Sequence, residues 1–318
     1  MTKFASTVLL ALVSLVPALR AAPQAQPAVG GVSSHPFQIS VDLNLVILPV
    51  TVRDKKGGFA TDLTQQNFEV FEDGVRQSIR LFRHEDIPVT VGLVVDHSGS
   101  MQNKMSDVLT AAQVFVGLSN PDDQMFVVNF NEHVTIGLPS AIPFTTRVAD
   151  IEAAVFNAPV AGETALYDAL GVALDRLKAG NREKKVLVVI SDGGDNASAL
   201  KLPQILQRAE ASRAIVYTIG IFDQNDPDQN AGVLRRLAKE TGGEAFFPAA
   251  SGEAVAICKE IARDIRHQYT LGYVSNNPQV GGMRRVRVVA KAAGKDLVVR
   301  TRPGYIAETP AEEKEEAR

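Results

Sequence analysis

The sequence predicts an α/β fold: a doubly wound, mostly parallel sheet with one antiparallel edge strand, flanked by a small antiparallel β unit. Two observations carry this prediction. In the central part of the 318-residue chain, short and almost wholly apolar runs alternate with segments of helical periodicity, which is typical of buried parallel strands connected by helices. On both sides, in residues 37–85 and 268–307, apolar and polar residues alternate with a period of two, as in half-buried antiparallel strands.

The first 22 residues have the pattern of an export signal. Lys3 provides a positive charge, residues 4–19 contain no charged side chain, and small residues follow. A retained membrane anchor is the alternative, but the apolar run is short for a spanning helix and contains Pro17. We therefore expect residues 1–22 to be a signal peptide and the chain to have no integral membrane span once the signal is cleaved.

Before the first strands, residues 23–36 are rich in Ala, Pro, Gln, Gly and Ser, which predicts a flexible leader. The N-terminal flanking region then follows. Its predicted strands are 38–52, 67–71 and 77–81, separated by turns at 54–58 and 72–74.

The central region supplies the parallel sheet. Its predicted strands are 89–95, 125–130, 186–190, 215–221 and 244–247, and its predicted helices include 105–116, 166–177, 234–238 and 252–267. Only residues 131–133 separate the second strand from the run that begins at Val134. Because this connection is too short for a crossover, that run must return antiparallel at a sheet edge. Cys258 lies on the apolar side of the last helix and is expected in the core, not as a nucleophile.

The C-terminal flanking region returns to a period of two. Its predicted strands are 269–273, 285–289 and 297–300. Because isolated hairpins are marginally stable in water, we expect 37–85 and 268–307 to pair into one small sheet or sandwich, with the central domain inserted between them. The last residues, 308–318, are expected to be a charged, disordered tail.

Composition excludes several classes of function. One cysteine rules out an internal disulfide and a cysteine-based zinc cluster, and an exported protein without disulfides suggests a bacterial periplasm or exterior. The 33 basic and 36 acidic side chains give a net charge of −3, so no basic excess favours nucleic-acid binding. The five histidines lack metal-ligand spacing, which argues against a zinc hydrolase.

Oxygen side chains at the ends of buried strands form the candidate site. Asp96, Ser98 and Ser100 occupy alternate positions directly after the first central strand, Thr164 lies in a loop that opens a helix, and Asp192 follows another core strand. If the loops converge, these oxygens suit a hard cation, Mg²⁺ above all.

These residues resemble the metal-ion-dependent adhesion site of von Willebrand factor A (VWA) domains. The Asp-x-Ser-x-Ser element, the distant Thr and the distant Asp occur here in the family's order, and the resemblance places a VWA domain at residues 86–267. The flanks, with the stretch Asp62–Gly74 and the terminal Pro303–Tyr305, are similar to those of secreted bacterial VWA proteins.

The resemblance implies a strand order of 3-2-1-4-5-6 and a role for each site residue. Ser98, Ser100 and Thr164 would contact the metal directly, switching with Asp192, while Asp96 would act largely through water. Because neutral hydroxyls dominate this shell, one coordination position stays open to an Asp or Glu of a partner protein. The implied cation is Mg²⁺, with Mn²⁺ or Ca²⁺ as alternatives.

Three functions are compatible with this site. The first is an exported, non-enzymatic module that captures a partner carboxylate through the cation. The second is a metal-dependent hydrolase, which needs a general base that only His97 or Asp195 offers; adjacent residues alternate in direction, so His97 cannot complete a triad with Asp96 and Ser98. The third is a structural assembly protein with an incidental metal. Glu163, Asn131 and Asp195 are expected to be solvated or capping residues.

Overall fold

The apolar runs of the central region form a six-stranded sheet. The computed structural model describes residues 45–222, 229–249, 252–279 and 281–307; the expected signal, leader and tail, and the start of the first predicted strand, lie outside these residues. The strand order is β10-β9-β8-β5-β6-β7, parallel throughout except between β6 and β7. The strands are β5 (Val89–Asp96), β6 (Gln124–Phe130), β7 (Val134–Ile136), β8 (Lys184–Ser191), β9 (Ile215–Gly220) and β10 (Ala245–Phe246).

The central strand β5 has no polar face because both of its faces are covered. All of its residues are buried, and it pairs with β6 on one side and β8 on the other. Close packing reaches its backbone at Gly92, where a Cβ would lie 2.5 Å from Cζ of Phe126 and 2.6 Å from Cδ2 of Leu187. β5 therefore lies in the centre of the close-packed core, and this packing fixes the position of the strand's carboxyl end.

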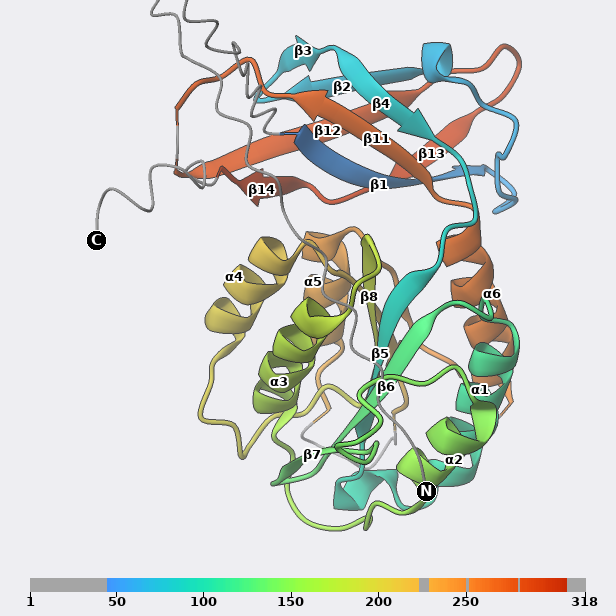
Figure 1. Cartoon of the computed structure of the whole chain (residues 1–318), viewed down its shortest axis with the longest axis vertical. Helices are drawn as coiled ribbons and strands as arrows, with labels where there is room; N and C mark the ends of the chain where they lie inside the picture. Colours follow the sequence, from blue (N-terminus) through green and yellow to red (C-terminus); the bar gives the residue numbers. More distant parts are fainter. Residues whose placement is uncertain (1–44, 223–228, 250–251, 280, 308–318) are drawn as a thin grey trace, which may run out of the picture. The chain divides into compact units, whose positions relative to one another are not determined.

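Helices cover both faces of this sheet (Figure 1). α1 contacts α2 and α6, whereas α4 contacts α3 and α5, so two separate groups of helices pack on the sheet. The helices are α1 (Met105–Gly117), α2 (Val148–Phe156), α3 (Leu166–Ala179), α4 (Leu202–Ser212), α5 (Ala231–Thr241) and α6 (Glu253–Arg266). Cys258 is buried among the apolar residues of α6. No described helix is both long and apolar enough to cross a membrane.

The flanking regions form two four-stranded antiparallel sheets, ordered β13-β1-β11-β4 and β14-β12-β2-β3. The N- and C-terminal segments interleave, because β1 pairs with β11 and β13, and β2 pairs with β12. Apolar residues of both sheets share one core, as in a sandwich. The strands are β1 (Leu45–Asp54), β2 (Phe68–Glu72), β3 (Val75–Gln77), β4 (Ile79–Arg83), β11 (Tyr269–Val274), β12 (Met283–Ala290), β13 (Leu297–Arg300) and β14 (Gly304–Ile306).

The predicted fold class is confirmed, including the antiparallel edge strand β7 and the flanking antiparallel sheets. One predicted element differs. The run 77–81 is two strands, because β3 pairs with β2 in one sheet and β4 pairs with β11 in the other. The chain changes sheets at Ser78, so a single period-two pattern spans two strands.

A buried carboxylate links the sandwich to the α/β domain. Asp264 of α6 accepts hydrogen bonds from the Thr51 hydroxyl at 2.6 Å and from the Tyr217 hydroxyl at 2.8 Å. The Arg300 guanidinium donates to the same carboxylate. Asp264 is fully buried. Its carboxylate contacts residues of β1, β9 and β13 at once, and these contacts compensate its buried negative charge.

Candidate metal centre

The strand order brings the candidate residues to one edge of the sheet. β5 and β8 are parallel neighbours, so Asp96 at the end of β5 and Asp192 after β8 lie at the same carboxyl edge. After β5 the next strand in sequence, β6, lies on one side of β5, whereas β8 and the strands of this sheet that follow it lie on the other side. The strand order therefore reverses between β5 and β8. Such a reversal point is where open α/β sheets bind ligands.

The loop after β5 is folded around the Asp96 carboxylate. Oδ1 accepts a hydrogen bond of 2.8 Å from the backbone N–H of Ser98, and Oδ2 accepts one of 2.6 Å from Oγ of Ser191. Asp96 is fully buried, and its two hydrogen bonds fix the carboxylate and the start of the loop. A short 3₁₀ turn, η2 (Gly99–Met101), follows and carries Ser100.

Hydroxyls of this loop meet the carboxylate from the neighbouring strand. The Oγ atoms of Ser98 and Ser100 are 3.2 Å apart, and Ser100 Oγ donates to Oδ2 of Asp192 at 2.6 Å. Oδ1 of Asp192 accepts from the backbone N–H of Gly194 at 3.1 Å. Three of the five candidate side chains, those of Ser98, Ser100 and Asp192, are thus linked in series by hydrogen-bonding contacts.

The loop that carries Thr164 is held against the other two loops by its backbone. The N–H of Gly99 donates to the carbonyl oxygen of Gly162 at 3.1 Å. The N–H of Thr164 donates to Oδ1 of Asn196 at 2.8 Å, and the Thr164 carbonyl accepts from the backbone N–H groups of Asn196 and Ala197. Thr164 itself is buried. Its loop is therefore fixed next to the loop after β5 and the loop after β8.

The site concentrates negative charge away from water. Burial raises the pKa of the Asp96 carboxyl to about 6, the hydrogen bonds from Ser191 and Ser98 oppose this rise, and the negative charge of Asp192 adds to it. Asp192 is also buried. Neither carboxylate forms an ion pair with a Lys or Arg of the described chain.

The donor set fits a hard divalent cation. Neighbouring ligands of octahedral Mg²⁺, each about 2.1 Å from the metal, lie about 3.0 Å apart. The oxygen separations of 2.6 Å and 3.2 Å at Ser100 bracket this value. Only oxygen atoms are offered, and within the described ranges no three His, Cys, Asp or Glu side chains gather to hold a metal. The site therefore suits Mg²⁺ or Mn²⁺ better than a metal that prefers nitrogen or sulfur ligands.

The two side chains that a hydrolase would need as a base have other partners. His97 is buried, its Nε2 lies 3.1 Å from Oδ1 of Asn129, and burial lowers its pKa. Asp195 accepts from the backbone N–H of Tyr167 at 3.1 Å and from the Ser198 hydroxyl at 2.5 Å. Asp195 thus caps the start of α3, as expected of a capping residue.

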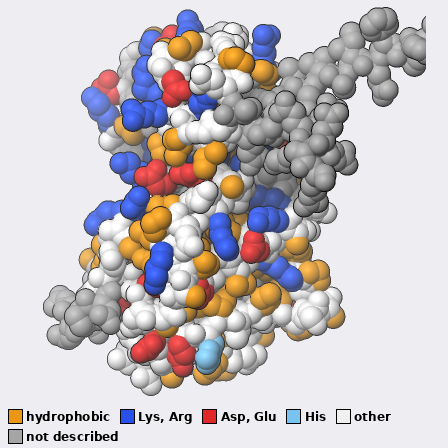
Figure 2. Space-filling model, turned by 90° about the vertical axis from the view of Figure 1, so that its left-hand side faces the viewer, with side chains coloured by type: hydrophobic (Ala, Val, Ile, Leu, Met, Phe, Trp, Pro, Cys, Tyr) orange, Lys and Arg blue, Asp and Glu red, His pale blue; other side chains and the backbone are white. Residues whose placement is uncertain are grey.

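The exposed residues at this edge of the sheet include two glutamates and a histidine. Glu132, His133 and Glu163 belong to the loops at this edge and are exposed, and Glu163 donates its backbone N–H to the Glu132 carboxylate at 3.0 Å. Acidic and histidine side chains gather at the lower end of the view in Figure 2, where the carboxyl ends of the strands lie. Asn131 instead accepts from the backbone N–H of His133 at 2.9 Å and stabilises the β6–β7 turn.

Sequence reasoning did not identify Ser191 and Asn196, which position the site residues Asp96 and Thr164. Ser191 immediately precedes Asp192, and adjacent strand residues point to opposite sides. This alternation was a signal that the Ser191 side chain points away from that of Asp192. No sequence pattern indicated the contact between Asn196 and Thr164.

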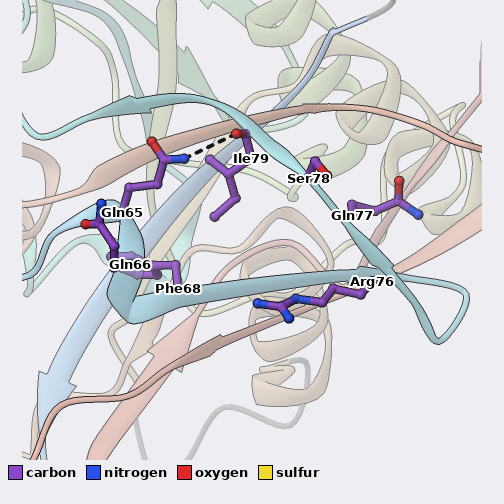
Figure 3. A pocket seen from close by; sticks show the side chains of 7 residues that line it. All are labelled: Gln65, Gln66, Phe68, Arg76, Gln77, Ser78 and Ile79. Carbon is purple, nitrogen blue, oxygen red and sulfur yellow. Dashed lines mark hydrogen bonds between the residues drawn. The ribbon is translucent and has the colours of Figure 1, made fainter.

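A pocket of about 610 Å³ lies in the sandwich, lined mainly by uncharged side chains (Figure 3). Gln65 Nε2 donates to the Ile79 carbonyl at 3.3 Å. The one titratable side chain in its lining, Arg76, pairs with Glu69 at 3.4 Å. The lining residues are Gln65, Gln66, Phe68, Arg76, Gln77, Ser78 and Ile79.

Comparisons with known proteins agree with the fold. The family model of the von Willebrand factor type A domain matches residues 90–260, more than half of the chain. An uncharacterized protein of Synechocystis sp. is 25% identical over 181 residues, 55% of this chain and 41% of that protein. The chain thus spans less than half the length of this relative.

Among solved structures, a von Willebrand factor type A protein from Catenulispora acidiphila has a TM-score of 0.51 at 14% identity, covering 85% of this chain and 76% of that one. Proximal thread matrix protein 1 of the mussel byssus, solved with a zinc-occupied metal-ion-dependent adhesion site, has a TM-score of 0.49 at 18% identity and covers 61% and 49%. At 14% identity, the likeness to the Catenulispora acidiphila protein is one of fold.

Proposed function

Because the chain belongs to the von Willebrand factor type A domain family, whose domains are generally metal-dependent protein-interaction modules, we propose that it is an exported, non-enzymatic adhesion or assembly module. It captures an Asp or Glu side chain of a partner protein through a bound divalent cation, Mg²⁺ above all. The observation that carries this proposal is the contact chain Ser98–Ser100–Asp192, which joins two hydroxyls to a buried carboxylate.

Each residue has a proposed role. Ser98, Ser100 and Thr164 contribute hydroxyl oxygens to the cation, and Asp192 contributes its carboxylate or hydrogen-bonds to Ser100. Asp96 is held by Ser191 and the backbone of Ser98. Its negative charge stabilises the cation without direct contact. When bound, the cation supplies a Lewis-acidic position that a partner carboxylate can occupy.

The charge balance supports capture of an anion. Two carboxylates and neutral hydroxyls leave a divalent cation with weak inner-shell compensation, because Asp96 acts at a distance through the loop. An incoming carboxylate adds the missing negative charge and the oxygen ligand that Mg²⁺ prefers. Hydrolysis lacks equivalent support, since His97 and Asp195 are engaged with Asn129 and the start of α3.

The test compares the full chain, without its expected signal, with two serine-to-alanine variants. Calorimetric titration with Mg²⁺ and Mn²⁺ is expected to show one binding site in the wild type and none in Ser100→Ala. Ser106→Ala, which removes an exposed hydroxyl in α1, is expected to bind the metal normally.

Partner capture is then compared with Mg²⁺ and with chelator. Proteins from the exporting compartment are expected to bind the immobilised chain only with Mg²⁺, and glutamate-containing peptides in excess should compete. Capture that persists in chelator and in Ser100→Ala would favour an assembly protein with an incidental metal. Metal-dependent cleavage of the captured protein would favour the hydrolase.

A further inference from the structure

A second pocket, of about 550 Å³, lies at the junction of the α/β domain and the sandwich and is rich in basic residues. Its walls come from α5, from β10 with the residues before it, from β12, and from β13 with the turn that follows. The lining consists of Arg235, Ala238, Lys239, Gly243, Glu244, Ala245, Val286, Arg287, Val288, Val299, Arg300, Thr301, Arg302 and Pro303. Its volume falls within the range of ligand-binding pockets.

Four cations of this lining have no ion-pair partner among the described residues: Arg235, Lys239, Arg287 and Arg302. The fifth cation, Arg300, is neutralised by Asp264 and by Glu244, the pocket's one acidic side chain. The pocket therefore presents a surplus of positive charge to any occupant.

Arg302 is the most informative of these cations because it is buried. Only 4% of its surface is exposed, and its guanidinium donates a long hydrogen bond of 3.4 Å to the Glu210 carbonyl. Burial, together with the positive charge of Arg213, lowers its pKa to about 10. The negative charge of Glu210 opposes this shift, and an anionic ligand would add charge-assisted hydrogen bonds to the buried guanidinium.

The two exposed arginines are already oriented at the rim. The Arg235 guanidinium lies 4.4 Å from the ring centre of Phe247, and that of Arg287 lies 4.2 Å from the ring centre of Phe71. Stacking on a ring restricts these side chains while leaving their N–H groups available. Less side-chain entropy is then lost when an anion binds.

The pocket favours an extended peptide over a small inorganic anion. The strands that border the pocket support this choice, because β10 and β13 are edge strands, each hydrogen-bonded to a strand on one side only. Their unpaired backbone groups can pair with an extended chain.

We propose that this pocket binds an extended acidic segment of a partner protein, with Glu or Asp side chains at Lys239, Arg287 and Arg302. The site is independent of the metal centre. It would give the protein a second contact surface, and two linked contacts raise overall affinity without either becoming stronger.

The test measures binding of fluorescent eight-residue peptides to the full chain by anisotropy. A peptide of alternating Glu and Val is expected to bind, whereas peptides of alternating Gln and Val or Lys and Val are not. Raising the salt concentration from about 0.05 M to about 0.5 M should weaken binding several-fold, because the contacts are between charges.

Variants locate the binding to the pocket. Lys239→Glu combined with Arg287→Glu changes only exposed side chains, so it should fold normally and bind the acidic peptide roughly tenfold more weakly or worse. Arg236→Glu combined with Lys259→Glu makes the same change of charge at two exposed residues outside the lining, so it is the matched control and should lower affinity little. Arg302→Gln should also reduce binding if circular dichroism shows it folded.

Several outcomes overturn the proposal. Equal affinity of the double variant at Lys239 and Arg287 and the matched double control would mean that the peptide binds elsewhere or through net charge alone. Binding of myristate without binding of the acidic peptide would assign the pocket to an anionic lipid. Repeating the measurement in chelator separates this pocket from the metal centre, because peptide binding here should not require Mg²⁺.

Discussion

Ser191 donates a hydrogen bond of 2.6 Å from its hydroxyl to Oδ2 of Asp96, so the end of β8 holds the carboxylate at the end of β5. The same Ser191 oxygen accepts from the backbone N–H of Gly193 at 3.0 Å. One fully buried hydroxyl therefore positions both the aspartate of the first loop and the loop that carries Asp192. Such contacts behind a metal site orient its ligands.

Replacing Ser191 with Ala is expected to weaken Mg²⁺ binding roughly 10- to 100-fold, as does the loss of other residues that position metal ligands. The substitution also leaves a buried carboxylate and a backbone N–H short of a partner, which should lower the free energy of unfolding by about 1–3 kcal/mol. Calorimetry measures the first effect and urea unfolding the second. A folded Ser191→Ala protein with the Mg²⁺ affinity of Ser106→Ala would contradict the positioning role.

Metal should stabilise the folded chain through the proposed site. A cation that binds only the folded state at 100 times its dissociation constant adds about 2.7 kcal/mol to the free energy of unfolding. We expect Mg²⁺ to raise the melting temperature of the wild type and of Asp175→Asn, an exposed carboxylate on α3. Asp192→Asn should show no such shift. A shift of equal size in Asp192→Asn would place the metal elsewhere.

Much of the fold could be predicted because its signals are local. The run Val89–Val95 is apolar at every position but two, and only a strand covered on both faces tolerates that pattern. The short link 131–133 likewise fixed the direction of β7, since three residues cannot cross over a sheet. These features depend only on the polarity of a short run and on the length of a connection.

Other features depend on contacts between distant residues. The register of β5 on β8 pairs Val95 with Ile190, so the next residues, Asp96 and Ser191, come into contact. No local pattern gives that register. The helices α2 and α4 were not predicted because each buries only three apolar residues, which leaves a weak apolar stripe in the sequence. The sheet change at Ser78 was hidden because alternation continues through it.

Asp264 should be among the most costly positions to truncate. Its carboxylate accepts from Thr51 and Tyr217 and pairs with Arg300, so Asp264→Ala removes the partner of two buried hydroxyls and one of the two carboxylates that pair with Arg300. Because Glu244 still pairs with the Arg300 guanidinium after the substitution, the cost comes mainly from the unpaired Thr51 and Tyr217 hydroxyls and the lost charge pair. We expect a loss of about 3 kcal/mol or more in the free energy of unfolding. Because the chain has no tryptophan, unfolding in urea is followed by far-ultraviolet circular dichroism.

An exposed ion pair provides the comparison for Asp264. Asp175 pairs with Lys178 at 2.7 Å on the surface of α3, and Asp175→Ala should cost less than about 1 kcal/mol. If the two alanine variants were equally stable, the buried network would not contribute to holding the sandwich on the α/β domain.

Gly92 in the middle of β5 should not tolerate even a methyl group. A Cβ there would lie 2.5 Å from the Phe126 ring and 2.6 Å from Leu187, so both side chains of the close-packed core must shift. We expect Gly92→Ala to lower the free energy of unfolding by about 1–3 kcal/mol. Gly117→Ala, at the end of α1 with nothing within 4 Å of its Cβ position, should instead gain up to about 1 kcal/mol. Urea unfolding of the two variants gives opposite signs if the core packs as described, whereas a gain in both would mean that the sheet has room at β5.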